Sequence, residues 1–451
     1  MTNPVQRAIA AHEQRFLAEL IEACRIPSVS GDAQALQTMA DWTLARLQRL
    51  GAQTALWPTT DGPPVVWAEI GAGPRSLTSY SHYDVQPADP LELWHSPAFE
   101  PTVRDGKLFA RGVADDKGDL LSRIHAVEIY QALYGDLPLR FKFFVEGEEE
   151  VGSPHLAPVA AAHADSIRAD GCLWESGGFD SQERYTLYLG VKGIQYVELS
   201  ARGATSDLHS AYGAIAPNPA WRLVQALNTL KAPDDTILID DFAAHVRPIT
   251  PLEEAYLDRI PFEGEAMKAR WGIPAFINDI ANRQALQRFL YAPTCTICGL
   301  RAGFIEEGQK TVLPSLATVK LDFRLVPDLT PELVLRLLRE HLDRRGYQDI
   351  HIRPMSALAP SRAHPEAAIV QAVTASVAAV YGHDPVIYPS HGGSGPLYAL
   401  GEGLGVDAVT VGVGYPGVNM HAPNENIRLA DYFKQIEFLV DLFRRFGTAA
   451  A

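Results

Sequence analysis

Four short apolar segments, each running into charged or imidazole side chains, constrain the fold of this chain most strongly. They are SLTSY (76–80), LRFKFFV (139–145), GCLWE (171–175) and AVTVGV (408–413). Two stretches with apolar residues at helical spacing, 8–26 and 34–51, precede them. Strands that alternate with helices predict an α/β layer with a mostly parallel sheet and helices on both faces.

The pattern changes from about Gly190 onward. Segments 196–203 and 317–327 have the pattern of antiparallel strands, and 219–230 is typical of a helix. Residues 364–382 then return to the first pattern. The sequence therefore predicts one α/β domain, interrupted by a smaller α+β domain, with these boundaries: 1–190 and 358–451 for the first, 191–357 for the second.

Length and composition limit the classes of function. A chain of 451 residues is too long for one ordinary core, which favours two domains. The net charge of -15 argues against binding to nucleic acid or to an anionic membrane surface. No segment reads as a signal peptide or as a bilayer span.

The cysteines indicate a reducing, cytoplasmic location. Four occur in the chain, and they have no pattern typical of a disulfide framework: Cys24, Cys172, Cys295 and Cys298. Cys295 and Cys298 form a C-x-x-C, but no second pair and no histidine cluster lies nearby in the sequence. An ordinary strand thiol is therefore favoured over a redox or zinc role.

Polar side chains gather at the predicted strand ends. His82 and Asp84 follow the first strand, a glutamate run at 146–150 follows the second, Glu175 ends the third, and His421 lies beyond the fourth. Ligands of open α/β sheets bind outside the carboxyl ends of the strands. Histidines and carboxylates converging there predict a site for zinc, cobalt or manganese.

Each of these residues alone also has an ordinary interpretation. Asp115 and Asp116 precede a predicted helix, and an aspartate in that position commonly caps the helix. The glutamates could form a solvated turn. Only their joint placement on successive strand ends favours a metal site, and that placement by itself assigns no roles.

Several ordered motifs resemble one known family. They are SHYDVQP (81–87), WHSPAFEP (94–101), DGKLFARGVADDKGD (105–119), EGEEEVGS (146–153) and GVNMHAPNENI (417–427). This chain resembles the co-catalytic zinc peptidases, which include carnosinase-like dipeptidases, succinyl-diaminopimelate desuccinylase, acetylornithine deacetylase, aminoacylase and carboxypeptidase G. The carnosinase-like branch is the most similar. The resemblance implies that the inserted domain serves as a lid and dimerisation domain.

The resemblance implies two zinc ions per chain, for which cobalt or manganese can substitute. His82 and Glu175 would bind the first ion, Glu150 and His421 the second, and Asp115 would bridge both. Many dipeptidases of the family carry Asp where this chain has Glu175, whereas the desuccinylase type carries Glu. That departure leaves the substrate branch open.

The resemblance also assigns catalytic residues. Glu149 would be the general base that acts on a metal-bridging water, Asp84 would support His82, and Glu146 and Glu148 would be structural. SDLHSAYG (206–213) resembles the segment whose histidine, here His209, polarises the scissile carbonyl or stabilises the oxyanion. The substrate carboxylate would be bound by Arg324, Gly393 and Ser394.

We therefore expect a metal-dependent amidohydrolase that cleaves a dipeptide or an N-acyl amino acid with a free carboxylate. A homodimer is implied, since in related dimers the histidine of that segment reaches the partner's site. An N-acyl-amino-acid deacylase or desuccinylase is the main alternative to a dipeptidase. Two less favoured functions are a relative that binds metal or peptide without activity and a dinuclear phosphoesterase, which uses the same ligand types.

Overall fold

The computed structural model describes residues 3–448. Its chain divides into two compact units. Unit 1 comprises residues 1–190, 362–389 and 396–451, and unit 2 comprises residues 191–361 and 390–395. The second crossing point therefore lies a few residues beyond the predicted 357/358 boundary, after the last long strand of unit 2.

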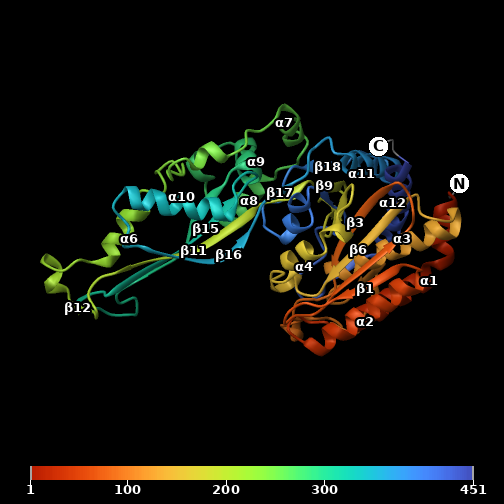
Figure 1. The fold of residues 1–451 in the computed structure, drawn as a ribbon, viewed down its shortest axis with the longest axis horizontal. Helices are drawn as coiled ribbons and strands as arrows, with labels where there is room; N and C mark the ends of the chain where they lie inside the picture. Colours follow the sequence, from red (N-terminus) through yellow and green to blue (C-terminus); the bar gives the residue numbers. More distant parts are fainter. Residues whose placement is uncertain (1–2, 449–451) are drawn as a thin grey trace. The chain divides into compact units, whose positions relative to one another are not determined.

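Unit 1 is built on a six-stranded sheet (Figure 1). In spatial order its strands are β1 (Gln53–Trp57), β2 (Val65–Ile70), β6 (Leu139–Glu146), β3 (Arg75–His82), β7 (Cys172–Trp174) and β19 (Ala408–Thr410). The pairings from β6 through β3 and β7 to β19 are parallel, whereas β1 and β2 add two antiparallel pairings at one edge. The predicted α/β fold with a mostly parallel sheet is confirmed.

The helices of unit 1 pack on this sheet and on one another. They are α1 (Pro4–Arg25), α2 (Ala33–Arg49), α3 (Gly118–Tyr134), α4 (Leu156–Ala162), α5 (Ala164–Ile167), α11 (Ala368–Tyr381) and α12 (Leu429–Thr448). Helix α2 contacts β1 and β2, while α12 contacts β6 and β3. Phe141, Phe143 and Phe144 of β6 are fully buried, as expected for a central strand covered on both faces.

Short strands complete unit 1. They form two three-stranded sheets: β20 (Asn426–Arg428), β5 (Lys107–Phe109) and β4 (Thr102–Arg104); and β18 (Val386–Tyr388), β9 (Tyr185–Tyr188) and β8 (Gly178–Phe179). Strand β20 pairs with β5, which joins the segment after His421 to the segment that leads to Asp115. This pairing brings two distant parts of the sequence together near the candidate site.

Unit 2 contains a four-stranded antiparallel sheet. Its strands, in spatial order, are β13 (Thr294–Ala302), β15 (Leu316–Leu325), β11 (Gly193–Arg202) and β16 (His351–Leu358). Strand β11 alternates between buried and more exposed residues, so one face of the sheet packs on a core. Val197, Leu199 and Phe323 are fully buried in that core.

The remaining elements of unit 2 are short, except for α10 (Figure 1). They are α6 (Pro219–Leu227), α7 (Pro251–Leu257), α8 (Gly264–Trp271), α9 (Asn282–Tyr291), α10 (Pro331–Arg344), β12 (Leu208–His209) and β14 (Val312–Leu313). Helices α6 and α10 contact the sheet. Residues 390–395 join this unit through Gly393, whose carbonyl accepts a hydrogen bond from the Lys192 backbone at 3.0 Å. A two-residue pair of β10 (Gly190–Val191) and β17 (Ser361–Arg362) lies at the two chain crossings.

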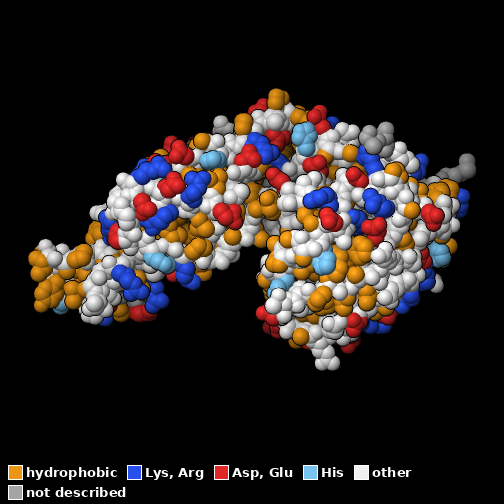
Figure 2. Space-filling model, in the orientation of Figure 1, with side chains coloured by type: hydrophobic (Ala, Val, Ile, Leu, Met, Phe, Trp, Pro, Cys, Tyr) orange, Lys and Arg blue, Asp and Glu red, His pale blue; other side chains and the backbone are white. Residues whose placement is uncertain are grey.

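The charged side chains are mixed on one face of the surface. On the face drawn in Figure 2, acidic and basic side chains are interspersed, so neither sign of charge dominates that face.

Among residues 3–448, no helix combines the length and the apolar character needed to cross a membrane. All four cysteines are free thiols; Cys295 is buried and Cys298 is exposed.

Candidate metal centre

The carboxyl ends of neighbouring strands bring the predicted polar residues together in unit 1. His82 is the last residue of β3, and it pairs in register with Glu146 at the end of β6. Asp115 lies in the short helical turn Val113–Lys117 just before α3. The parallel arrangement places these chain ends at one edge of the sheet, where ligands of open α/β sheets bind.

Two groups of potential metal ligands share one carboxylate. His82, Asp115 and Glu175 form the first group, and Asp115, Glu150 and His421 form the second. Within each group the ligand atoms lie within 4.8 Å of one another. All five residues that the sequence predicted as ligands are therefore brought together, with Asp115 common to both groups.

The first group is buried. His82 Nε2 lies 2.9 Å from Asp115 Oδ1 and 3.2 Å from Glu175 Oε2, and the His82 side chain is 0% exposed. His82 Nδ1 lies 3.0 Å from the Asp84 backbone oxygen and 3.2 Å from Asp84 Oδ1. With Nδ1 as the donor to Asp84, the lone pair of Nε2 points to the other ligands, which is the tautomer that a metal needs.

The second group is more open. His421 Nε2 lies 2.9 Å from Asp115 Oδ2 and 3.1 Å from Glu150 Oε2, and the His421 side chain is 54% exposed. His421 has a positive φ of 57°, which is uncommon outside glycine and is often seen at functional sites. Gln86 fixes Glu150, because its backbone and side-chain nitrogens donate to Oε1 at 3.1 Å and to Oε2 at 3.0 Å.

The charges of these residues depend strongly on one another. Burial opposes a proton on His82, yet Glu175, Asp115 and Asp84 outweigh it and hold the pKa of His82 well above its usual value. Burial raises the pKa of Glu175 well above its usual range, although His82 opposes that shift. Hydrogen bonds to Asp115 and Glu150 raise the pKa of His421 to about 10. The carboxylates of this cluster therefore favour positive charge on the groups beside them, as a bound cation would also supply it.

The donor atoms of the two groups fit divalent metal ions. Each group offers an imidazole nitrogen and carboxylate oxygens, the ligand types that zinc, cobalt and manganese accept. Glu175 Oε2 is buried and accepts no hydrogen bond from the part of the chain that the structure describes. A buried carboxylate oxygen without a hydrogen bond lowers the stability of the folded state, and a bound cation would supply the missing partner.

Asp84 connects the first group to the glutamate run. Its carboxylate faces His82 and also accepts hydrogen bonds from the backbone nitrogens of Glu149, at 3.2 Å, and Glu150, at 3.1 Å. Ser30 Oγ donates to the same carboxylate at 2.8 Å. One fully buried aspartate therefore orients an imidazole and holds the turn that carries the next two glutamates.

Glu149 lies in this turn, in the short helix Glu149–Val151. Burial is the main cause that raises the pKa of Glu149 to about 7, with His82 opposing the shift and Asp115 adding to it. A carboxyl group whose pKa lies near neutrality can both accept and return a proton at physiological pH. This is the property that the sequence-based assignment of Glu149 requires.

The other glutamates of the run have structural partners. Glu146 Oε1 accepts hydrogen bonds from the Tyr80 hydroxyl at 2.6 Å and from Ser153 Oγ at 2.8 Å. Glu148 Oε2 lies 2.7 Å from Nδ1 of His155. Neither residue belongs to a ligand group among residues 3–448.

The ordinary interpretation of Asp116 as a helix cap is wrong. Helix α3 begins without a side-chain cap, and Asp116 Oδ2 instead accepts a hydrogen bond from the His82 backbone nitrogen at 3.2 Å. The peptide bond between Asp115 and Asp116 is cis. Through its hydrogen bond to the His82 backbone, Asp116 contacts the end of β3 and does not cap the helix.

Sequence reasoning missed Glu425, which holds the turn around Asp115. Its carboxylate accepts hydrogen bonds from the backbone nitrogens of Gly112 at 2.9 Å and Ala114 at 2.8 Å, and from Arg111 Nη1 at 2.6 Å. Glu425 is fully buried and lies four residues after His421. The sequence motif contained this residue, but its contacts cross more than 300 positions and left no local signal.

The remaining predicted residues belong to unit 2. Arg324 Nη1 donates to Ser394 Oγ at 2.9 Å, and Arg324 Nη2 lies 3.3 Å from Asp322 Oδ2. The Gly393 backbone N–H donates to His391 Nδ1 at 3.1 Å, so this donor already has a partner. His209 is exposed, and its Nδ1 accepts from the Ala211 backbone at 3.1 Å. Arg324 and Ser394 are thus brought together within this unit.

Comparison with known proteins identifies relatives of this chain. The model of peptidase family M20/M25/M40 matches residues 78–445. The Cys-Gly metallodipeptidase dug1 of Schizosaccharomyces pombe is 29% identical, over 94% of this chain and 94% of that protein. The Beta-Ala-His dipeptidase of Rattus norvegicus is 28% identical, over 96% of this chain and 93% of that protein.

A solved structure shows the same fold. The M20 family metallo-carboxypeptidase of Sulfolobus solfataricus is 33% identical to this chain, with a TM-score of 0.85 over 96% of this chain and 99% of that one. The family match covers all of unit 2 and most of unit 1. The resemblance inferred from the motifs is confirmed. The chain belongs to peptidase family M20/M25/M40 and is therefore an enzyme of the metallopeptidase class.

Proposed function

We propose that the chain is a dinuclear metallohydrolase that cleaves the amide bond of a dipeptide or an N-acyl amino acid with a free carboxylate. The observation that carries the proposal is the pair of ligand groups that share Asp115. A carboxylate common to two groups is the feature expected of a two-metal site. The names of the relatives, a Cys-Gly metallodipeptidase and a Beta-Ala-His dipeptidase, support a dipeptide as the substrate.

The residues that would hold two zinc ions are the five ligands described above. His82 and Glu175 would serve one ion, Glu150 and His421 the other, and Asp115 both; cobalt or manganese would substitute. Two divalent cations held there would polarise the scissile carbonyl and lower the pKa of the attacking water molecule.

Glu149 is the proposed general base and acid. It would remove a proton from the attacking water and deliver it to the leaving nitrogen. Its raised pKa supports this role, because the group then exchanges protons readily near neutral pH. Asp84 is the proposed positioning residue, since its carboxylate contacts His82 and the backbone of Glu149.

The proposed substrate contacts lie in unit 2. Arg324 and Ser394 would bind the substrate carboxylate, because a guanidinium fork suits a bidentate contact. Ser394 Oγ accepts from Arg324 at 2.9 Å and donates to the Gly193 carbonyl at 3.0 Å, and it would turn that donation to the substrate. His209 is proposed to stabilise the oxyanion. Gly393 is proposed to shape the loop, since its own N–H is already donated to His391.

We also propose a cytoplasmic homodimer whose dimerisation domain is unit 2. Strand β13 lies at one edge of the antiparallel sheet, and Ile297 and Leu300 on it are each 55% exposed. Edge strands with exposed apolar side chains readily pair with another chain. The four free thiols support a reducing compartment.

The experiment that tests the proposed function measures amine release from a mixed panel. The zinc-loaded protein is incubated with dipeptides and with N-acetyl, N-succinyl and N-carbamoyl amino acids, and cobalt and manganese are run in parallel. Glu149→Gln is the blank. Release from one class that is absent in the blank supports a hydrolase and identifies the branch. If no compound of the panel releases amine although two metals are bound per chain, the proposal is contradicted.

A further inference from the structure

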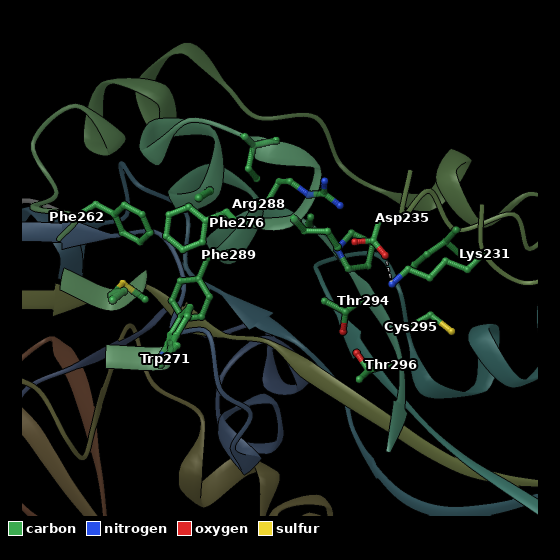
Figure 3. A pocket seen from close by; sticks show the side chains of 17 residues that line it. Lys231, Asp235, Phe262, Trp271, Phe276, Arg288, Phe289, Thr294, Cys295 and Thr296 are labelled. Carbon is green, nitrogen blue, oxygen red and sulfur yellow. Dashed lines mark ion pairs between the residues drawn. The ribbon is translucent and has the colours of Figure 1, made fainter. Parts of the chain in front are cut away.

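Unit 2 contains a cavity that no role assigned above uses (Figure 3). Its volume is about 330 Å³, within the size range of sites for small ligands. The walls come from α8, from residues 276–280, from α9 and from the start of β13. All of these segments belong to unit 2, so the cavity is a property of that unit alone.

One end of the cavity is aromatic. Figure 3 shows the rings of Phe262, Phe276, Phe289 and Trp271 gathered on the same side. The Phe262 and Phe276 ring centroids lie 5.9 Å apart, and Trp271 meets Phe276 edge-on at 6.3 Å. Trp271 and Phe289 are each 53% exposed. Clustered aromatic side chains left this exposed are typical of a surface that binds an apolar group.

The other end of the cavity is polar. Lys231 and Asp235 form an ion pair there, and Thr294 and Thr296 lie beside it (Figure 3). Arg288 also lines the cavity. Apolar walls with a few placed polar groups are the usual composition of a small-molecule site, because the polar groups fix the orientation of the ligand.

The cavity adjoins the proposed carboxylate-binding pair. Thr294, in its wall, is the register partner of Arg324 on the neighbouring strand, and the Arg324 backbone N–H donates to Thr294 Oγ1 at 3.3 Å. Side chains of directly paired residues lie on the same face of a sheet. The Arg324 side chain therefore leaves β15 on the face to which Thr294 contributes.

A second contact reaches the same pair from the aromatic end. The Phe289 ring lies against Gly392 so closely that a Cβ atom there would be 2.1 Å from the ring. Gly392 leads directly into Gly393 and Ser394, and Ser394 Oγ accepts the hydrogen bond from Arg324. The aromatic wall and the carboxylate-binding loop thus form one continuous surface within unit 2.

We infer that this cavity receives the aromatic side chain of the substrate residue whose carboxylate binds Arg324. The inference rests on the proposed function and names the substrate class: peptides with Phe, Tyr or Trp at the carboxyl terminus. A carboxylate at Arg324 and Ser394 would direct the side chain of its own residue along the Gly392–Phe289 wall into the cavity. Rings that pack edge-to-face and offset would hold an aromatic side chain better than an aliphatic one of equal size.

The test compares kcat/KM for Ala-Phe and Ala-Trp with kcat/KM for Ala-Gly, using the zinc-loaded full chain. The wild type is expected to prefer the aromatic dipeptides by at least about tenfold, the discrimination that a hydrophobic pocket supplies. Trp271→Ala is expected to remove most of that preference while Ala-Gly hydrolysis persists. Trp221→Ala is the matched control, because Trp221 is 66% exposed on α6 and lies outside the cavity.

A second variant keeps the test valid if Trp271→Ala folds poorly. Met267→Trp fills the cavity from α8 and is expected to raise KM for Ala-Phe with little change for Ala-Gly. Equal kcat/KM for Ala-Phe and Ala-Gly in the wild type, or a preference that both variants leave unchanged, would overturn the role of the cavity. If none of the three dipeptides is hydrolysed while the mixed panel described above still releases amine, the cavity assignment fails alone; if the mixed panel releases no amine either, the proposed function fails as well.

Discussion

The two units of the molecule contain candidate sites of very different character for one proposed reaction. The candidate metal centre of unit 1 is a cluster of buried, mutually charged groups held by hydrogen bonds, as His82, Asp84 and Asp115 illustrate. The candidate substrate surface of unit 2 has a cationic group, Arg324, beside a cavity with an aromatic end. Under the proposed function, this difference predicts that unit 1 supplies most of the chemical step and that unit 2 governs which substrate is held.

The largest expected effect lies in unit 1. Glu149→Gln is expected to lower kcat by about 10³-fold, since general base catalysis contributes on the order of 10²–10⁴. Metal content, measured by atomic emission, should stay unchanged because Glu149 belongs to neither ligand group. Glu148→Gln is the matched control on the neighbouring residue. Near-normal turnover of Glu149→Gln would remove the residue from the mechanism.

His209→Ala is the change most able to break the division between the units. As a proposed oxyanion donor in unit 2, His209 is expected to contribute about 10²-fold to kcat and nothing to metal content. Steady-state kinetics together with metal analysis separates the two effects. Unchanged kcat would refute the oxyanion role and would leave all the chemistry in unit 1.

Arg324→Lys is expected to raise KM by about tenfold for substrates with a free carboxylate, while kcat changes little. Lysine keeps the charge but loses the planar fork that binds both carboxylate oxygens. The control is the same substrate with its carboxylate amidated, whose KM should not respond to the variant. An equal rise for both substrates would show that Arg324 does not contact the carboxylate.

The smallest effect is a pH dependence that belongs to unit 1. The pKa of Glu149 is raised to about 7 without metal, and bound cations would lower it. A base works only when deprotonated, so kcat/KM should fall as the pH drops through an acid limb centred no higher than about pH 7. A profile of kcat/KM from pH 5 to 9 locates that limb. A limb centred above pH 8 would contradict the assignment.

The two units also differ in how much of them the sequence predicts. The ligands of unit 1 follow strand ends, and a parallel sheet brings strand ends together, so the sequence pattern finds His82, the glutamate run and Glu175 as candidates. Only the resemblance to the family singles out Glu150 within the run. Glu425 and Gln86 escape sequence reasoning because they act through backbone contacts and long-range pairs that leave no periodicity. Asp116 resembles a helix cap in the sequence because nothing local indicates the shape of the turn before α3.

Unit 2 is predicted less completely. Its antiparallel strands alternate clearly, and the resemblance to the family leads to Arg324 and Ser394, which the structure joins by a hydrogen bond. The aromatic cavity is visible only in the structure. Its rings lie on short helices and connecting loops, where Phe276 and Phe289 form no regular pattern and meet only after the chain has folded.

One measurement tests the central claim most directly: zinc titrated into metal-free protein while dipeptide hydrolysis and bound zinc are followed together. Two ligand groups that share Asp115 predict that activity rises until two zinc ions are bound per chain and then stays constant. Protons should be released as zinc binds, since His421, whose pKa is raised to about 10, must lose its proton to become a ligand. Full activity with a single zinc ion per chain, or none with two, would contradict the account.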